Sequence, residues 1–144
     1  MDRRQFIQAG SAASVLGVAA GCASTGGGSG AGGNVVVVGG GYGGATAAKY
    51  IRMWSEGRVN VTLVEPNDSF ISCPISNLVI GGSKQMADIT TPYDNLAKRH
   101  GVKIIKDRAV SIDAGKRTVT LAGGTVLPYD RLVLSPGIEF MWDA

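Results

Sequence analysis

The chain has 144 residues, of which 44% are hydrophobic and 17% are charged, and its formal net charge is +3. This length fits one ordinary domain, and the composition is that of a globular protein rather than a disordered one. The Lys and Arg residues are scattered, without a dense basic run or interleaved aromatic residues, so we expect no nucleic acid among its partners.

Residues 1–23 are predicted to be a secretory signal peptide. Arg3 and Arg4 precede a short apolar stretch rich in Ala, Gly and Ser, which is too short to span a bilayer stably. This start resembles a twin-arginine signal, and Cys22 lies in a sequence similar to a lipoprotein cleavage box. We therefore expect a periplasmic protein without a transmembrane span, and both a lipid anchor at Cys22 and simple cleavage nearby stay open. The alternative is an amphipathic first helix.

The next part of the chain changes abruptly from a linker to a folded segment. Residues 24–33 are rich in Gly, Ser and Ala and are predicted to be a flexible linker. The domain is expected over residues 34–144. Residues 35–38 are all valine, which is typical of a parallel strand covered on both faces. A helix is predicted over residues 42–56. Its core-facing residues are expected at helical spacing: Ala45, Ala48, Ile51 and Trp54.

The remaining elements are shorter. A second strand is predicted over residues 59–65, and residues 66–82 are expected to be irregular because of their Pro and Gly residues. Thr91 is predicted to cap a short helix that ends at Gly101. The later strands are predicted over residues 102–105, 108–112, 117–121, 125–127 and 132–134, with residues 113–116 as a hairpin turn between the second and third of these.

A phosphate-binding loop is predicted between the first strand and the first helix. It contains G-x-G-x-x-G, and its five expected cofactor contacts are Gly39, Gly41, Tyr42, Gly43 and Gly44. Gly39 allows a tight turn, Gly41 lets the backbone approach a pyrophosphate, and Gly44 lets the helix pack closely on the sheet. The helix N-terminus supplies unpaired amides and a positive dipole end.

Glu65 closes the second strand, about 20 residues after the last glycine of the loop, where a carboxylate can accept both ribose hydroxyls. It would repel a 2′-phosphate, so NADP is a poor fit. The motif alone does not separate FAD from NAD. The alternative interpretation is a glycine-rich turn without a ligand, with Glu65 as a solvated strand end.

The order of elements resembles the N-terminal part of flavoprotein disulfide reductases with two dinucleotide domains, and Ser135-Pro136-Gly137 resembles their flavin-contacting turn. Within that superfamily the chain is similar to the flavoprotein subunit of flavocytochrome c sulfide dehydrogenases. The residues that carry this resemblance are 37–41, 43–51, 61–67, 72–82, 129–131 and 135–139. It implies an incomplete α/β, Rossmann-like FAD-binding domain whose parallel sheet has a small antiparallel β-meander insertion.

The resemblance also implies chemistry. Cys73 matches the cysteine that bonds through sulfur to the 8α-methyl group of FAD, and Ser135, Pro136 and Gly137 would contact the flavin. Electrons would pass from sulfide through FAD to a c-type cytochrome subunit. The alternative for Cys73 is a small buried apolar residue. Cys22 and Cys73 are the only cysteines, so the redox-active cysteine pair of such enzymes is missing.

We therefore expect no catalytic residue and no metal site in this chain. It is interpreted as the N-terminal portion of a longer enzyme, unable to turn over sulfide by itself. Two alternatives stay open. One is a sulfide:quinone reductase or NADH-dependent flavoprotein with non-covalent FAD, and the other is a non-catalytic dinucleotide-binding remnant.

Overall fold

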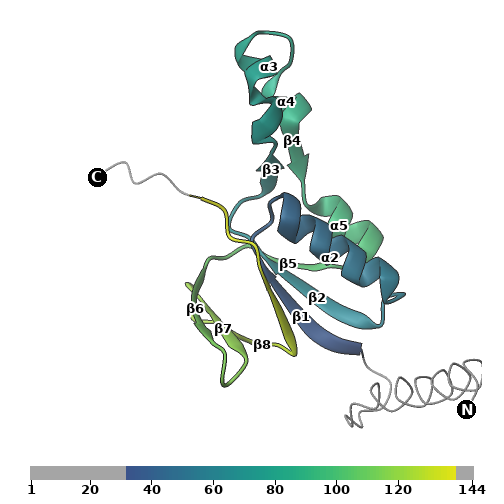
Figure 1. Ribbon diagram of the computed structural model, residues 1–144, viewed down its shortest axis with the longest axis vertical. Coiled ribbons are helices and arrows are strands. Elements are labelled where there is room, and N and C mark those ends of the chain that lie inside the picture. Colours follow the sequence, from purple (N-terminus) through teal and green to yellow (C-terminus); the bar gives the residue numbers. More distant parts are fainter. Residues whose placement is uncertain (1–31, 139–144) are drawn as a thin grey trace, which may run out of the picture. The chain divides into compact units, whose positions relative to one another are not determined.

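The computed structural model describes residues 32–138, and the fold below refers to this part of the chain (Figure 1). The predicted signal peptide with Cys22, and the predicted linker as far as residue 31, lie outside the described residues. The first strand begins at Gly32, so it includes the last two residues of the stretch predicted to be a linker.

A four-stranded parallel sheet forms the centre of the fold, as the sequence predicts. Its strand order is β5-β2-β1-β9, and all three neighbouring pairs are parallel. The strands are β1 (Gly32–Val38), β2 (Val59–Val64), β5 (Lys103–Ile105) and β9 (Arg131–Leu134). From β1 the chain adds β2 and β5 on one side and β9 on the other. The sheet therefore has a topological switch point at β1, which is where open α/β sheets bind ligands.

The register brings the carboxyl ends of the four strands to one edge. Val38 of β1 pairs with Val64 of β2 and with Leu134 of β9, and Val64 pairs in turn with Ile105 of β5. The segments that leave these strands consequently start side by side.

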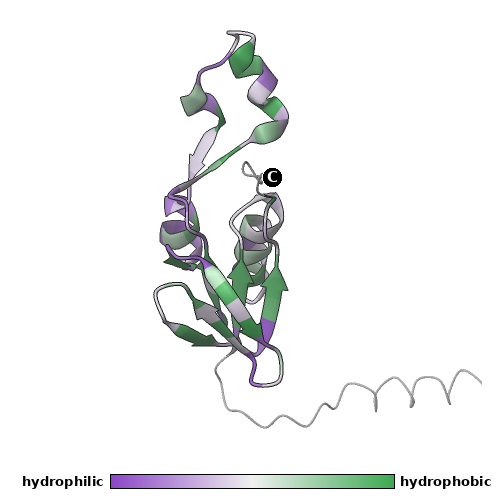
Figure 2. Cartoon of the chain, turned by 90° about the vertical axis from the view of Figure 1, so that its left-hand side faces the viewer, coloured by the Kyte–Doolittle hydropathy of each residue, from purple (hydrophilic) through white to green (hydrophobic). Residues whose placement is uncertain are grey.

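Both faces of the sheet are covered, which explains the unbroken valine run of β1. Val37 lies in a buried cluster with Ala48 of helix α2 (Tyr42–Trp54), and Leu96 of helix α5 (Asp94–His100) packs against the same cluster. Val36 points to the opposite face. Val36, Val37 and their neighbour Val35 are at most 8% exposed. Figure 2 shows hydrophobic residues concentrated in the strands of the sheet.

The second face is covered by an antiparallel meander, as predicted. It consists of β6 (Ala109–Asp113), β7 (Thr118–Leu121) and β8 (Val126–Pro128). Val119 and Leu121 of β7 are at most 1% exposed and pack against Val36. The predicted turn is present: the Lys116 amide donates to Asp113 Oδ1 at 2.8 Å.

The prediction that Trp54 lies in the core is wrong, because its side chain is 77% exposed. A helix turns about 100° per residue, so Trp54 lies about 120° around the helix from Ala48, whereas Ser55 lies within about 20° of it. The inward face therefore continues through Ser55. Trp54 instead packs against Tyr50, with ring centroids 5.0 Å apart.

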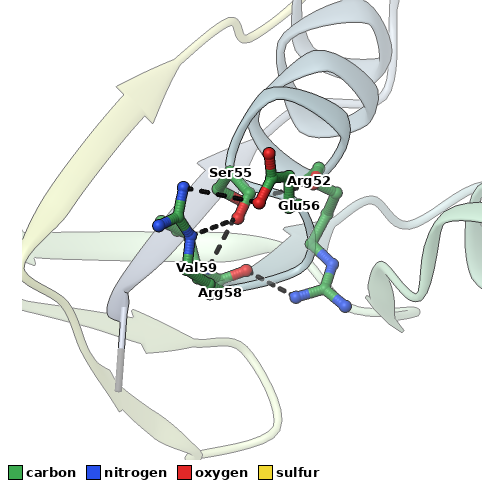
Figure 3. A network of polar contacts seen from close by, with 5 residues as sticks. All are labelled: Arg52, Ser55, Glu56, Arg58 and Val59. Carbon is green, nitrogen blue, oxygen red and sulfur yellow. Dashed lines mark hydrogen bonds and ion pairs between the residues drawn. The ribbon is translucent and has the colours of Figure 1, made fainter. Parts of the chain in front are cut away.

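A polar network joins the end of α2 to the start of β2 (Figure 3). Arg52 Nη1 donates to the carbonyl oxygens of Val59 at 2.6 Å and Gly57 at 2.7 Å, and Arg52 Nε donates to the carbonyl oxygen of His100 at 3.0 Å. Ser55 Oγ accepts from the Val59 amide at 3.3 Å. The arginine thereby binds carbonyl groups of the turn after α2, of β2 and of α5.

The segment between β2 and α5 is more ordered than the sequence predicts. It contains β3 (Ser69–Ile71), the 3₁₀-helix η1 (Cys73–Ile75), α3 (Ser76–Ile80), α4 (Met86–Ile89) and β4 (Thr90–Pro92). The prediction that Thr91 caps a helix is wrong, because Thr91 pairs with Phe70 in a two-stranded ribbon. Helix α5 begins at Asp94 and ends, as predicted, before Gly101, which has a φ of 64°. Among residues 32–138 no helix is long and apolar enough to cross a membrane.

Candidate dinucleotide-binding site

The predicted phosphate loop leaves β1 at the switch-point edge of the sheet. Gly39 has a φ of 95°, a conformation that L side chains rarely adopt, and its amide donates to Val64 O at 2.9 Å. A Cβ atom at Gly39 would lie 2.0 Å from Ser135 O. The loop therefore turns sharply between β2 and β9, and only glycine fits at this position.

Gly44 brings the first turn of α2 onto this loop. A Cβ atom at Gly44 would lie 1.8 Å from Gly39 O and 3.3 Å from Val37 Cγ1. Gly41, the residue before α2, is different, because nothing lies within 4 Å of the position that its Cβ would take. The backbone at Gly41 is thus open to an approaching group.

The start of α2 presents amides without partners. The Ala45 amide donates to Gly41 O at 3.0 Å and makes the first bond of the helix. Within residues 32–138 no acceptor is recorded for the four preceding amides, those of residues 41–44. The first turn also has no acidic residue. Such a helix start attracts anions, phosphate groups in particular.

Glu65 lies against the loop. It is 8% exposed, and its Oε2 accepts from the Gly40 amide at 2.7 Å. Its Oε1 accepts from the backbone amide of Asn67 at 3.0 Å and from the Asn67 side-chain amide at 2.7 Å. A carboxylate has about four lone-pair positions, so Oε2 retains capacity for another donor. The structure thus places Glu65 within reach of the loop, and its bond to a ribose stays a prediction.

Tyr93 is a member of this site that the sequence reasoning missed. Its hydroxyl donates to Gly40 O at 2.9 Å, and the residue is 7% exposed. Burial, and secondarily the negative charge of Glu65, raises the pKa of Tyr93 to about 12. The phenol is therefore a neutral donor at ordinary pH. No local pattern signals this role, because Tyr93 follows a segment that was itself assigned to the wrong element.

The Ser135-Pro136-Gly137 turn meets the glycine loop. The Ser135 amide donates to Val38 O at 2.9 Å, and a Cβ atom at Gly39 would lie 2.0 Å from Ser135 O and 2.7 Å from Ser135 C. Ser135 Oγ would lie 2.8 Å from a Cβ at Gly43. Nothing lies within 4 Å of a Cβ position at Gly137. The structure therefore brings this turn beside the phosphate loop, with Gly137 facing open space.

Tyr42 and Cys73 are connected through Ser72. The hydroxyls of Tyr42 and Ser72 are hydrogen-bonded, and the Tyr42 ring meets Phe70 edge-on with centroids 4.7 Å apart. Cys73, the next residue, is a free and exposed cysteine. It is therefore not the buried apolar residue of the alternative interpretation. Cys73 is the first residue of η1 and follows Ser72, which contacts Tyr42 at the start of α2.

A cavity of about 580 Å³ adjoins the loop on the α2–α5 side. Gly41, Tyr42, Phe70 and Tyr93 are among the residues that line it, whereas Glu65, Cys73 and Ser135 are not. The cavity therefore shares Gly41 and Tyr42 with the predicted site, while those three residues of the site lie outside its lining. In the described part of the chain no group of three or more His, Cys, Asp or Glu side chains is placed to hold a metal ion.

These features define a class of protein. A parallel sheet carries a glycine loop at its switch point, the next helix presents free amides there, and a carboxylate ends the neighbouring strand. This combination is that of a Rossmann-like dinucleotide-binding domain.

The family is shown by sequence comparison. The profile of the pyridine nucleotide-disulphide oxidoreductase family matches residues 33–141, so the chain belongs to this family of FAD-dependent oxidoreductases. It is 58% identical over 38 residues to the sulfide dehydrogenase [flavocytochrome c] flavoprotein chain of Chlorobaculum thiosulfatiphilum, covering 26% of this chain and 77% of the sequence of that relative. It is 31% identical over 86 residues to the sulfide-quinone reductase of Aquifex aeolicus, covering 60% of this chain and 20% of that relative.

Solved structures agree with the fold. The sulfide:quinone oxidoreductase of Aquifex aeolicus superposes with a TM-score of 0.67 and 31% identity, over 77% of this chain and 26% of that one. The CoADR-RHD protein of Bacillus anthracis gives a TM-score of 0.63 and 27% identity, over 74% of this chain and 20% of that one. This chain therefore spans about a quarter or less of the length of these two structures.

Proposed function

We propose that this chain is the FAD-binding part of a sulfide-oxidising flavoprotein that passes electrons from sulfide through FAD to a c-type cytochrome. The observation that carries the proposal is the 58% identity to a sulfide dehydrogenase flavoprotein chain, in a chain whose loop and Glu65 fit a dinucleotide. Its coverage of the Aquifex relatives is 20–26%, so the activity is proposed for the whole enzyme.

The residues at the switch point fit FAD. The amides of residues 41–44 would donate to the pyrophosphate, and the empty space at the Gly41 Cβ position lets the phosphates approach the backbone. The remaining lone pair on Glu65 Oε2 would accept from a ribose hydroxyl. The same buried carboxylate disfavours a 2′-phosphate. Ser135, Pro136 and Gly137 would contact the flavin.

Cys73 is proposed to attach the flavin covalently. Its exposed thiol follows Ser72, which Tyr42 holds at the start of α2. A thioether would join the Cys73 sulfur to the 8α carbon of FAD, with loss of the S–H bond and of one C–H bond of the methyl group. The two electrons and two hydrogens released would reduce the flavin ring system, so the step would balance without another oxidant. When bound, FAD supplies an acceptor of electron pairs that can pass electrons on singly.

Acid precipitation tests the covalent bond. Protein from flavin-replete cells is precipitated with acid, and absorbance is read in the washed pellet. Wild-type protein is expected to retain the flavin, and Cys73→Ser is expected to release it to the supernatant. Cys22→Ser is the matched control and should behave as wild type. Release of all flavin from the wild-type protein would contradict the attachment.

A second candidate is a sulfide:quinone reductase with non-covalent FAD. The 31% identity to the Aquifex sulfide-quinone reductase over 86 residues favours it. The full-length protein with sulfide separates the two: cytochrome c reduction supports the first function, and reduction of a short-chain quinone alone supports the second. If the full-length protein binds FAD but reduces neither acceptor, the chain belongs to a non-catalytic dinucleotide-binding protein.

We also propose that the protein is exported through the twin-arginine signal in residues 1–23. The test is cell fractionation of a tagged chain. Wild-type protein is expected in the periplasm, and replacing both Arg3 and Arg4 by Lys should retain it in the cytoplasm. Labelling with a radioactive fatty acid, compared with Cys22→Ser, tests whether Cys22 carries a lipid. A cytoplasmic wild-type protein would contradict the export.

A further inference from the structure

We propose that Tyr93 is a positioning residue of the dinucleotide site: its hydroxyl, together with the Glu65 carboxylate, orients the Gly40 backbone so that the Gly41 amide faces the phosphates. This inference rests on the proposed binding of FAD at the switch point.

Gly40 is held from both sides. Its amide donates to Glu65 Oε2 at 2.7 Å, and its carbonyl oxygen accepts from the Tyr93 hydroxyl at 2.9 Å; both bonds are buried. A Cβ atom at Gly40 would lie 2.4 Å from the Tyr93 hydroxyl oxygen, so the loop backbone rests directly on the phenol.

The Tyr93 ring belongs to the core, so its hydroxyl can hold the Gly40 backbone in a fixed position relative to the sheet. It is 7% exposed and lies in the buried cluster with Val37 and Leu63, which are fully buried. Its backbone lies between β4 and α5. The hydroxyl is thereby fixed relative to the sheet, and it is not a mobile surface group that happens to meet the loop.

Because a peptide unit is planar, the hydrogen bond to the Gly40 carbonyl group also sets the direction of the Gly41 amide. The Gly40 carbonyl and the Gly41 amide belong to the same planar, trans peptide unit, so they point in opposite directions. Since the carbonyl is bound to a core residue, the Gly41 amide points away from the core. The Glu65 bond fixes the preceding peptide unit in the same way, so that Gly39 O lies against Gly44. Two consecutive peptide units are therefore oriented before any ligand arrives.

The Tyr93 hydroxyl also stays protonated and can therefore donate to the Gly40 carbonyl group. Burial first and the nearby Glu65 charge second raise its pKa to about 12, so the hydroxyl keeps its proton at physiological pH. The Glu65 carboxylate and the neutral phenol therefore bind the amide and the carbonyl group of the same glycine.

The test is Tyr93→Phe in the full chain, which keeps the ring and removes only the hydroxyl. We expect FAD and ADP, which carry a diphosphate, to bind about threefold to tenfold more weakly, as for one lost hydrogen bond. Adenosine, which lacks the diphosphate, should bind with unchanged affinity. Tyr129→Phe is the matched control: Tyr129 is half-buried, and no hydrogen bond of its hydroxyl is recorded among the described residues.

The outcomes separate the two proposals. Wild-type chain that binds neither FAD nor ADP overturns the proposed dinucleotide site itself. Wild-type binding that Tyr93→Phe leaves intact overturns the positioning role alone. An equal loss of adenosine and ADP affinity also overturns it, because a merely structural defect would weaken every ligand. Selective loss of the diphosphate ligands, with Tyr129→Phe unchanged, supports it.

Discussion

Replacing Gly44 by alanine is expected to push the first turn of α2 away from the phosphate loop. The new Cβ would lie 1.8 Å from Gly39 O, whereas real Cβ atoms essentially never approach another atom within 3.0 Å. The helix start or the loop must therefore move by about 1.2 Å. The clash cannot be relieved by rotating a side chain, because the obstructing atom belongs to the backbone of Gly39. The Gly39 amide is in turn hydrogen-bonded to Val64 O.

The size of the effect follows from two opposing contributions. Overpacking of this kind costs about 1–3 kcal/mol, and alanine in place of glycine returns up to about 1 kcal/mol of helix propensity. We expect Gly44→Ala to lower the free energy of unfolding by about 1–2 kcal/mol. FAD should bind at least about tenfold more weakly, because amides displaced by about 1 Å lose hydrogen bonds to charged oxygens worth about 1.5–3 kcal/mol each.

Urea denaturation measures the free energy of unfolding, and a flavin fluorescence titration measures the affinity for FAD. Gly43→Ala is the matched control for stability, because it changes the same turn but meets only Ser135 Oγ, at 2.8 Å, which can rotate away. That variant should be as stable as wild type or slightly more stable. If Gly44→Ala matches wild type in both stability and FAD affinity, the close approach of helix and loop is not what shapes the site.

Three further outcomes are expected. Arg52→Lys should lower the free energy of unfolding in urea by about 2–3 kcal/mol, because the single ammonium nitrogen of lysine cannot replace both Nε and Nη1, which lie at separate positions. Arg58→Lys, at a side chain that is 68% exposed, should change it by less than about 0.5 kcal/mol. The pKa of Tyr93 is raised from 10.0 to about 12, so the stabilisation by its protonated hydroxyl is complete below pH 10 and is lost as the pH rises towards 12. Between pH 10 and 12 the urea midpoint of Tyr93→Phe should therefore fall less than that of the wild-type protein. Glu65→Gln should weaken FAD binding about tenfold or more, and titration with ADP-ribose and its 2′-phosphate should show weaker discrimination between them; equal discrimination would contradict the role of the carboxylate.

The sequence was sufficient where a local pattern has one physical solution. An unbroken valine run requires cover on both faces, and the structure provides it with α2 and α5 on one side and the meander on the other. The spacing of Gly39, Gly41 and Gly44 predicted the loop, and the position of Glu65 at the end of β2 predicted that it lies near the loop. The loop and Glu65 belong to one βαβ unit, and the valine run predicts that its faces are covered without saying which elements cover them.

The failures concern contacts between distant segments. Thr91 and Pro92 have the residue types of a helix start, yet they pair with β3, which no local pattern indicated. This error hid Tyr93, whose importance arises only from its contact with Gly40. Trp54 was assigned to the core because it continues the series Ala45, Ala48 and Ile51. A series spaced by three residues drifts around a helix of 3.6 residues per turn, so Ser55 lies inward instead. Spacing along the chain was therefore a misleading guide to burial at Trp54.

The phosphate loop owes its shape to strand order as much as to its glycines. On one side β2 supplies Val64 O, which accepts from the Gly39 amide; on the other β9 supplies Ser135, whose amide bonds to Val38 O and whose carbonyl oxygen faces Gly39. The whole meander lies between β1 and β9 in the chain, so this closure is not local. Since a one-residue slip of a strand changes every partner it has, a shift in the register of β9 would open the loop without altering any glycine. The motif is therefore a necessary part of the site, and the parallel pairing on both sides of β1 is what completes it.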